Sequence, residues 1–279
     1  MGPLGVDNDK IFASLPGPKV DGMEASLLKN AKLMEKNGEY SKAMQLYKQL
    51  VEMEDENDDY LLALATNLRR TGEIENAAAA YELLLERDAD NLDALEGKGL
   101  LYLYEGDFDK AGKTLTTVHQ KDQTRWRTLN GLGILFVERG MYNEAVAYFK
   151  EAITHSERNV TVLNNVGLTH AINDSPEKAI AAFGRAVDLA PAKSPIKRSV
   201  ELNLAMVMGI YGDMDVAEKL LKEHLPEHAV ANNMGLFAYL AKEEKLAKSY
   251  LNMALSSSPY HYQRAWENLA AITENSEGQ

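Results

Sequence analysis

Small and apolar residues recur along this chain at the spacing of one face of an α-helix, and the pattern repeats every 34 residues. A marker residue occupies the same point in each repeat, and an alanine follows it five positions later. The marker and alanine pairs are Gly38 and Ala43, Gly72 and Ala77, Gly106 and Ala111, Gly140 and Ala145, and Asp174 and Ala179. Gly212 follows after 38 residues and Lys242 after 30 more, which restores the phase. This periodicity predicts a helix–turn–helix unit stacked many times.

The clearest unit runs from residue 126 to 159 and predicts two amphipathic helices. Leu132 and Phe136 fall on one face of the first helix, and Gly133 leaves room on that face for a crossing helix. Gly140 is expected to end the first helix, because a left-handed backbone conformation at that point favours glycine. The small residue of this face recurs in other units as Ala65, Gly99, Gly167, Ala205 and Gly235.

Seven such units are predicted within residues 23–259, followed by one further helix. The units are 24–57, 58–91, 92–125, 126–159, 160–193, 198–227 and 228–259. Residues 260–273 predict a capping helix that covers the last apolar face, with Tyr262, Ala265, Trp266 and Leu269 packed inward. Residues 1–22 are expected to be a cloning scar and a disordered leader, and residues 274–279 a disordered tail.

A period of 34 residues made of two helices is that of the tetratricopeptide repeat (TPR), and the chain resembles that superfamily. The resemblance implies an all-α, right-handed superhelical solenoid whose first helices line a concave groove. It further implies a protein that binds other proteins. Because the repeats account for nearly the whole chain, no segment is left for a catalytic domain, and we expect the protein not to be an enzyme.

Charge and residue types exclude several other functions. The net charge is −12 and there is no run of five basic residues, so nucleic acid is not an expected partner. The chain has no cysteine, which excludes thiolate catalysis and cysteine-bound zinc. His224, Glu227 and His228 match the spacing of a zinc-protease motif, but Pro226 should break the helix that this motif needs. Neither a metal nor a cofactor is therefore predicted.

Asparagines at the fifth and sixth positions of the first helices are the main candidates for partner binding. They are Asn130, Asn164, Asn165, Asn203, Asn232 and Asn233. An amide donates and accepts hydrogen bonds, so a row of amides can hold an extended peptide backbone. Alternatively, these amides only bond neighbouring helices across the interface between repeats. Tyr104 lies off the packing face of its helix and is a further groove candidate.

Cations on the first helices could bind a carboxylate, as the clamp of co-chaperone TPR domains does. The candidates are Lys29, Lys32, Lys36, Arg69, Arg70 and Arg127. They do not combine with asparagines in three consecutive units, which such a clamp requires. The favoured interpretation is therefore a solvated face, with Arg127 alone kept among the groove candidates.

The stretch from residue 217 to 240, AEKLLKEHLPEHAVANNMGLFAYL, makes the resemblance more specific. Its leucine–proline break before an ANN-containing helix resembles TadD-type proteins of the bacterial tight-adherence (Flp) pilus machinery. The RAWENLA ending, residues 264–270, resembles the closing helix of pilus-biogenesis TPR proteins. This resemblance covers residues 126–272.

The TadD-like resemblance implies a pilotin-like factor that assists secretin or pilus assembly. Its partner would be the outer-membrane secretin or another pilus component. The expected location is the periplasm or the outer membrane, with membrane contact only through a lipid anchor that this cysteine-free sequence lacks. A cytoplasmic TPR adaptor or co-chaperone that binds a peptide in its concave groove is the alternative.

Overall fold

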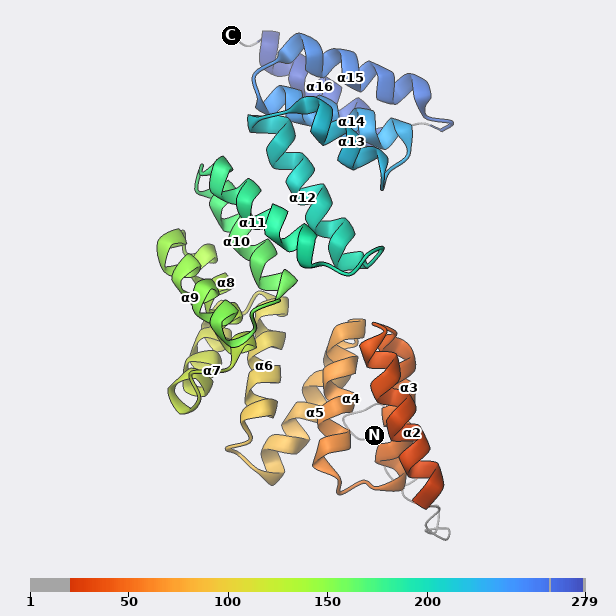
Figure 1. The fold of residues 1–279 in the computed structure, drawn as a ribbon, viewed down its shortest axis with the longest axis vertical. Helices are drawn as coiled ribbons and strands as arrows, with labels where there is room; N and C mark the ends of the chain where they lie inside the picture. The colour runs from red at the N-terminus through yellow and green to blue at the C-terminus, as the bar shows by residue number, and fades with distance from the viewer. Residues whose placement is uncertain (1–20, 261, 278–279) are drawn as a thin grey trace. The chain divides into compact units, whose positions relative to one another are not determined.

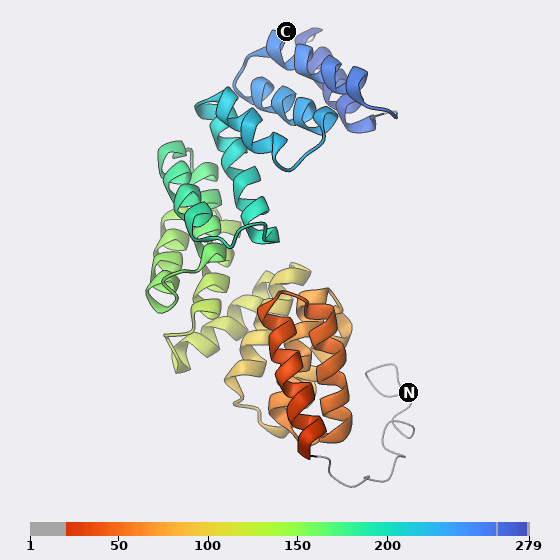
Figure 2. The same cartoon turned by 45° about the vertical axis from the view of Figure 1, so that its right-hand side comes forward.

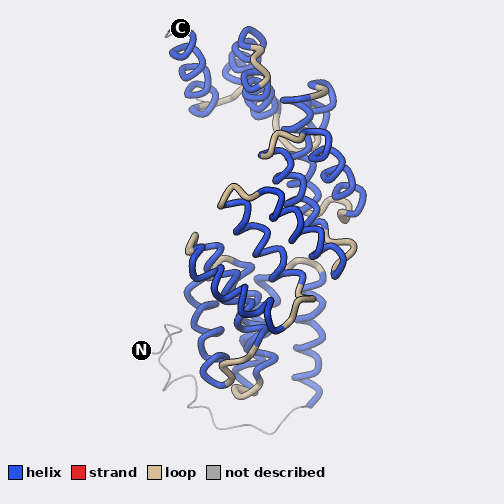
Figure 3. The backbone as a smooth tube through the Cα atoms, turned by 90° about the vertical axis from the view of Figure 1, so that its left-hand side faces the viewer, coloured by secondary structure: helices blue, strands red, loops and turns tan. Residues whose placement is uncertain are grey.

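The structure, a computed structural model, describes residues 21–260 and 262–277. Within these ranges the chain consists of α-helices joined by short loops, and it contains no strand (Figure 3). Among the described helices, none is long and apolar enough to span a membrane. The fold is thus the all-α helical-repeat class that the periodicity predicts.

The chain divides into two compact units, and the division falls inside α8, between Leu135 and Phe136. The first unit holds α2 (Asp21–Lys36), α3 (Tyr40–Met53), α4 (Asp58–Thr71), α5 (Ile74–Arg87), α6 (Leu92–Glu105), α7 (Phe108–Lys121) and most of α8 (Trp126–Glu138). The second unit continues with α9 (Tyr142–His155), α10 (Val160–Ile172), α11 (Pro176–Leu189), α12 (Pro195–Tyr211), α13 (Met214–Lys222), α14 (Glu227–Leu240), α15 (Glu244–Ser257) and α16 (Gln263–Glu277).

In the first unit each helix from α2 to α7 packs against the next one along the chain (Figures 1 and 2). The first helices of neighbouring pairs also meet, because α4 contacts α6. Tyr47, Leu64, Tyr81 and Leu84 are buried between the pairs. Nearest-neighbour stacking of this kind is what makes a repeat array grow in one direction.

The second unit repeats this pattern from α9 to α15, and α16 closes it. The helix α16 contacts both α14 and α15, as the first helix of a further pair would. It buries Ala265 and Ile272 and partly buries Leu269. The predicted inward packing of Trp266 is wrong, since this side chain is 54% exposed. One residue turns a helix by about 100°, so Trp266 cannot share the face that its neighbour Ala265 buries.

The turns between paired helices confirm the role predicted for the marker glycines. Gly38, Gly72, Gly106 and Gly140 have positive φ angles of 76°, 84°, 76° and 71°. Asp174 and Lys242 stand at the same point and adopt the same left-handed conformation, with φ of 48° and 65°. The backbone geometry of the turn is therefore retained even where glycine is absent.

The small residues of the first helices lie where the two helices of a pair cross, as predicted. A Cβ atom added to Gly167 would lie 2.5 Å from the ring of Phe183, and one added to Gly235 would lie 2.7 Å from Leu251. At Gly99 the same atom would lie 2.7 Å from Leu115. Each second helix inserts a large side chain into the space that the missing side chain leaves.

The ends of the chain differ in part from the sequence-based bounds. Of the predicted leader, residues 1–20 lie outside the described residues, and residues 21 and 22 already belong to α2. At the other end α16 continues to Glu277, beyond the expected limit at residue 273, and residues 278–279 lie outside the described residues.

Candidate functional site

A polar cavity of about 480 Å³ opens in the first compact unit. Its wall comes from the first helices α2, α4, α6 and α8, together with the ring of Tyr81 from α5. We call it the arginine cavity, after the guanidinium groups of Arg69, Arg70 and Arg127 in its wall. The helix periodicity puts these three residues on the same side of the repeats because all three lie off the buried stripe of their helices.

One carboxylate in the wall of the arginine cavity, that of Glu35, already accepts several hydrogen bonds. The Tyr47 hydroxyl and the Asn67 amide each donate to it, both at 2.9 Å. An Nη atom of Arg70 lies 3.6 Å from it. Burial, and then the Glu35 carboxylate, raise the pKa of Tyr47.

Glu96 and Asp93 are engaged in the same way, by residues at the start of α8 and just before it. The backbone N–H and hydroxyl of Thr128 donate to Glu96 at 3.1 Å and 2.7 Å. Arg125 donates to Asp93 at 2.8 Å and lies 3.7 Å from Glu96. These acids therefore fix the position of α8 against α6 through internal hydrogen bonds.

The arginines of the cavity are less well satisfied than its acids. The Nε atom of Arg69 is buried and has no hydrogen-bond partner among the described residues. Arg127 stacks over the ring of Trp126, with its guanidinium carbon 4.5 Å from the ring centroid. Burial lowers the pKa of Arg127; Glu96 opposes this shift, and the charges of Arg70 and Arg69 add to it. Arg70 lies over the ring of Tyr40, at 4.7 Å.

The interpretation of the first-helix cations as a solvated face is therefore wrong for Arg69, Arg70 and Arg127, and also for Lys36, which lines the same cavity. Lys29 and Lys32 are exposed, as that interpretation expects. The sequence did not reveal the grouping because Arg69 ends one first helix and Arg127 begins another, two repeats further on. Only stacking of the repeats brings opposite helix ends to one cavity.

The candidate asparagines of the second unit bond one another across repeats. Asn203 of α12 donates to Asn164 of α10 at 2.8 Å, and Asn268 of α16 donates to Asn232 of α14 at 3.0 Å. Asn233 donates to the carbonyl oxygen of Ala229 at 2.7 Å, within its own helix. An amide that makes one such bond keeps further donor and acceptor capacity, so peptide binding by these residues stays a prediction.

The remaining candidates differ in exposure. Asn130 lies in the first compact unit and is buried, with 9% of its surface exposed. Asn165 is half-buried, and its backbone oxygen accepts the hydroxyl of Thr169 at 2.7 Å. Tyr104 is 71% exposed near the end of α6, and it does not line the arginine cavity. Of the residues predicted from the sequence, that cavity contains Arg127 alone.

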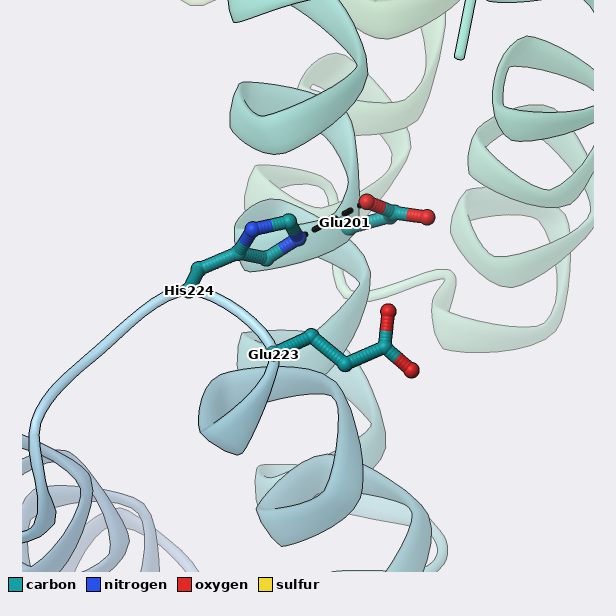
Figure 4. A group of neighbouring side chains, drawn as sticks. All are labelled: Glu201, Glu223 and His224. Carbon is teal, nitrogen blue, oxygen red and sulfur yellow. Dashed lines mark hydrogen bonds and ion pairs between the residues drawn. The ribbon is translucent and has the colours of Figure 1, made fainter. Parts of the chain in front are cut away.

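A second polar cluster, formed by Glu201, Glu223 and His224, lies in the second unit (Figure 4). The Nε2 atom of His224 is 2.8 Å from the Glu201 carboxylate, as the dashed line in Figure 4 marks. The ammonium group of Lys197 lies 3.8 Å from the same carboxylate. This nearby positive charge opposes a metal cation, and the cluster serves as a link between α12 and the loop after α13.

The zinc-protease motif does not assemble, as the position of Pro226 predicts. His224 lies in the loop after α13, whereas His228 lies in the first turn of α14. Pro226 is the N-cap residue of α14. Because the helix is interrupted, the two imidazoles are not placed on one helical face.

Comparison with known families gives one clear match. The profile described as tetratricopeptide repeat matches residues 28–91, 62–118 and 130–194, which together make up more than half of the chain. No curated protein matches the chain in a sequence search.

Several solved structures are similar in fold. The Cut9–Hcn1 hetero-tetramer of the APC/C gives a TM-score of 0.68 at 20% identity, over 87% of this chain and 48% of that one. This chain thus spans about half the length of that relative. The pilF protein of Pseudomonas aeruginosa gives 0.58 at 21% identity, over 78% of this chain and 98% of that one. YrrB, described as a TPR protein with an unusual peptide-binding site, gives 0.51 at 18% identity, over 68% and 97%.

Proposed function

Because this chain belongs to the tetratricopeptide repeat family, we propose that it is a non-catalytic scaffold that binds a segment of a partner protein during tight-adherence pilus assembly. The observation that carries the proposal is the arginine cavity, whose wall combines residues from four successive first helices. A concave wall with unsatisfied polar groups suits an extended polypeptide segment, because such a segment brings backbone and side-chain partners for several positions at once.

The assignment to pilus assembly is supported by sequence resemblance. Residues 217–240 and 264–270 resemble TadD-type and related pilus-biogenesis proteins. In the structure the leucine–proline break separates the short helix α13 from α14, and the RAWENLA segment forms the first half of α16. The partner would be the secretin or another pilus component, met in the periplasm or at the outer membrane.

A proximity experiment tests this function. The protein, tagged at its C-terminus and produced at its native level, is crosslinked in its own bacterium and purified for mass spectrometry. We expect a secretin or another pilus component to be enriched over a strain that expresses the tag alone. Cell fractionation of the same strain should recover the protein with the periplasm or the outer membrane.

Two results would contradict the assignment to pilus assembly. One is the enrichment of cytoplasmic chaperones or their clients together with a cytoplasmic location, which would support the adaptor alternative. The other is a full-length gene that encodes no export signal before the repeats. Neither result would bear on the chemistry of the arginine cavity.

A further inference from the structure

The arginine cavity contains cationic donors that the protein itself leaves unused. The buried Nε atom of Arg69 has no hydrogen-bond partner among the described residues. Arg127 stacks on Trp126, and within the described chain no carboxylate forms an ion pair with it or with Arg69. A buried donor without an acceptor is unfavourable, and a ligand that supplies the acceptor removes that penalty.

The acids in the same wall do not meet this need. Glu35, Glu96 and Asp93 accept from donors of neighbouring helices. The remaining acid of the wall, Asp59, is exposed at the start of α4. The internal hydrogen bonds therefore orient the acids towards the scaffold, while the guanidinium groups of Arg69 and Arg127 remain available to a ligand.

We infer that the arginine cavity receives one carboxylate of the partner polypeptide, held between Arg69 and Arg127. This inference rests on the proposed function and specifies the chemistry of the segment that binds. The hydroxyls of Thr66 and Tyr81, 3.4 Å apart in the wall, supply neutral donors beside the cations. Gly97 makes this arrangement possible, because a Cβ atom there would lie 2.2 Å from the Tyr81 ring.

The geometry and the charge balance favour a carboxylate over a phosphate. A guanidinium group donates two parallel hydrogen bonds to the planar carboxylate, which fits the fork of Arg69 or Arg127. Four acidic side chains also line the cavity, so a second negative charge on the ligand would be repelled at close range. The carboxylate can come from an aspartate or glutamate side chain, or from the end of a chain.

Synthetic peptides test the inference without the natural partner. The first probe is the peptide Gly-Ser-Glu-Glu-Gly-Ser, acetylated and amidated at its ends, and its control replaces both glutamates by glutamine. A third peptide, Gly-Ser-Gly-Ser with an acetylated start and a free carboxylate end, distinguishes a chain end from a side chain. Binding is measured by calorimetry on the full chain at low and at moderate salt.

Fluorescence provides a local readout of the same binding. The chain has 2 tryptophans, and Trp266 lies on α16 in the second unit. In a Trp266→Phe background, Trp126 alone reports, and it lies against Arg127. We expect the glutamate peptide to change the Trp126 emission in a saturable way, and the glutamine peptide to leave it unchanged.

Charge-removing variants then locate the site. Arg69→Gln should weaken binding of the glutamate peptide at least tenfold, which corresponds to about 1.4 kcal/mol. Arg127→Gln, followed by calorimetry, should have a similar effect. Arg139→Gln is the matched control, because Arg139 is exposed and outside the cavity wall, and it should bind like the unmodified chain. Circular dichroism verifies that each variant is folded.

Either of two results would overturn the inference. One is equal binding of the glutamate and glutamine peptides, including no binding by either. The other is unchanged affinity in a folded Arg69→Gln variant. Should that variant fail to fold, Arg127→Gln and the salt dependence decide, since carboxylate binding must weaken as ionic strength rises. Binding of the free-ended Gly-Ser peptide with the same dependence on Arg69 would assign the site to a chain end.

Discussion

Replacement of Gly167 by alanine tests whether close helix crossing stabilises the repeats. Gly167 lies in α10, and an added Cβ atom would come within 2.5, 2.7 and 2.8 Å of three ring atoms of Phe183. Phe183 is fully buried, so its ring cannot swing aside without disturbing the core. Overpacking of this kind costs about 1–3 kcal/mol. The gain in helix propensity from glycine to alanine is about 1 kcal/mol and offsets part of that cost.

Gly184 offers a matched control in the paired helix α11. An added Cβ atom there meets no other atom within 4 Å, so Gly184→Ala should gain helix propensity without a clash. We expect Gly184→Ala to raise the free energy of unfolding by about 1 kcal/mol. Because the propensity gain is common to both variants, Gly167→Ala should be less stable than Gly184→Ala by about 1–3 kcal/mol.

Urea unfolding followed by circular dichroism measures this difference directly. The midpoints and slopes of Gly167→Ala, Gly184→Ala and the unmodified chain are compared under one set of conditions. If Gly167→Ala proved as stable as Gly184→Ala, the crossing of α10 and α11 would have room for a methyl group. The argument that glycine is required at this position for close packing would then fail.

Three further predictions concern a turn, a buried hydroxyl and the candidate groove. Lys242→Gly should stabilise the protein by about 1 kcal/mol, because the residue has a φ of 65°; a thermal melt with no increase in midpoint would contradict this. The Glu24 carboxylate raises the pKa of Tyr60 to about 12, so this contribution to stability is present below about pH 10 and lost as the pH rises through 12. Glu24→Gln should lower that pKa in an absorbance titration of the tyrosines. Replacement of both Asn164 and Asn165 by alanine should weaken partner binding by about 0.5–1.5 kcal/mol per lost hydrogen bond. A loss of stability with unchanged affinity would show that these amides only join the repeats.

The sequence alone determined the repeat architecture of this protein. The 34-residue period, the marker glycines and the small residues on the first helices all act over short distances along the chain. Turn conformation at Gly72 or Gly140, and helix crossing at Gly167, depend on residues that the same unit contains. Local rules of backbone conformation and helix packing were therefore sufficient to predict helix pairs and their order.

The tertiary structure decided which polar residues meet. Arg69 and Arg127 are 58 positions apart in the sequence, and only the stacking of α4, α6 and α8 places both in one cavity wall. The same stacking supplies hydrogen-bond donors to Glu35 and Glu96, which leaves the arginines without an internal acceptor. Whether a charged side chain is solvated, paired or available to a ligand depends on neighbours from other repeats, and helical periodicity does not encode those neighbours.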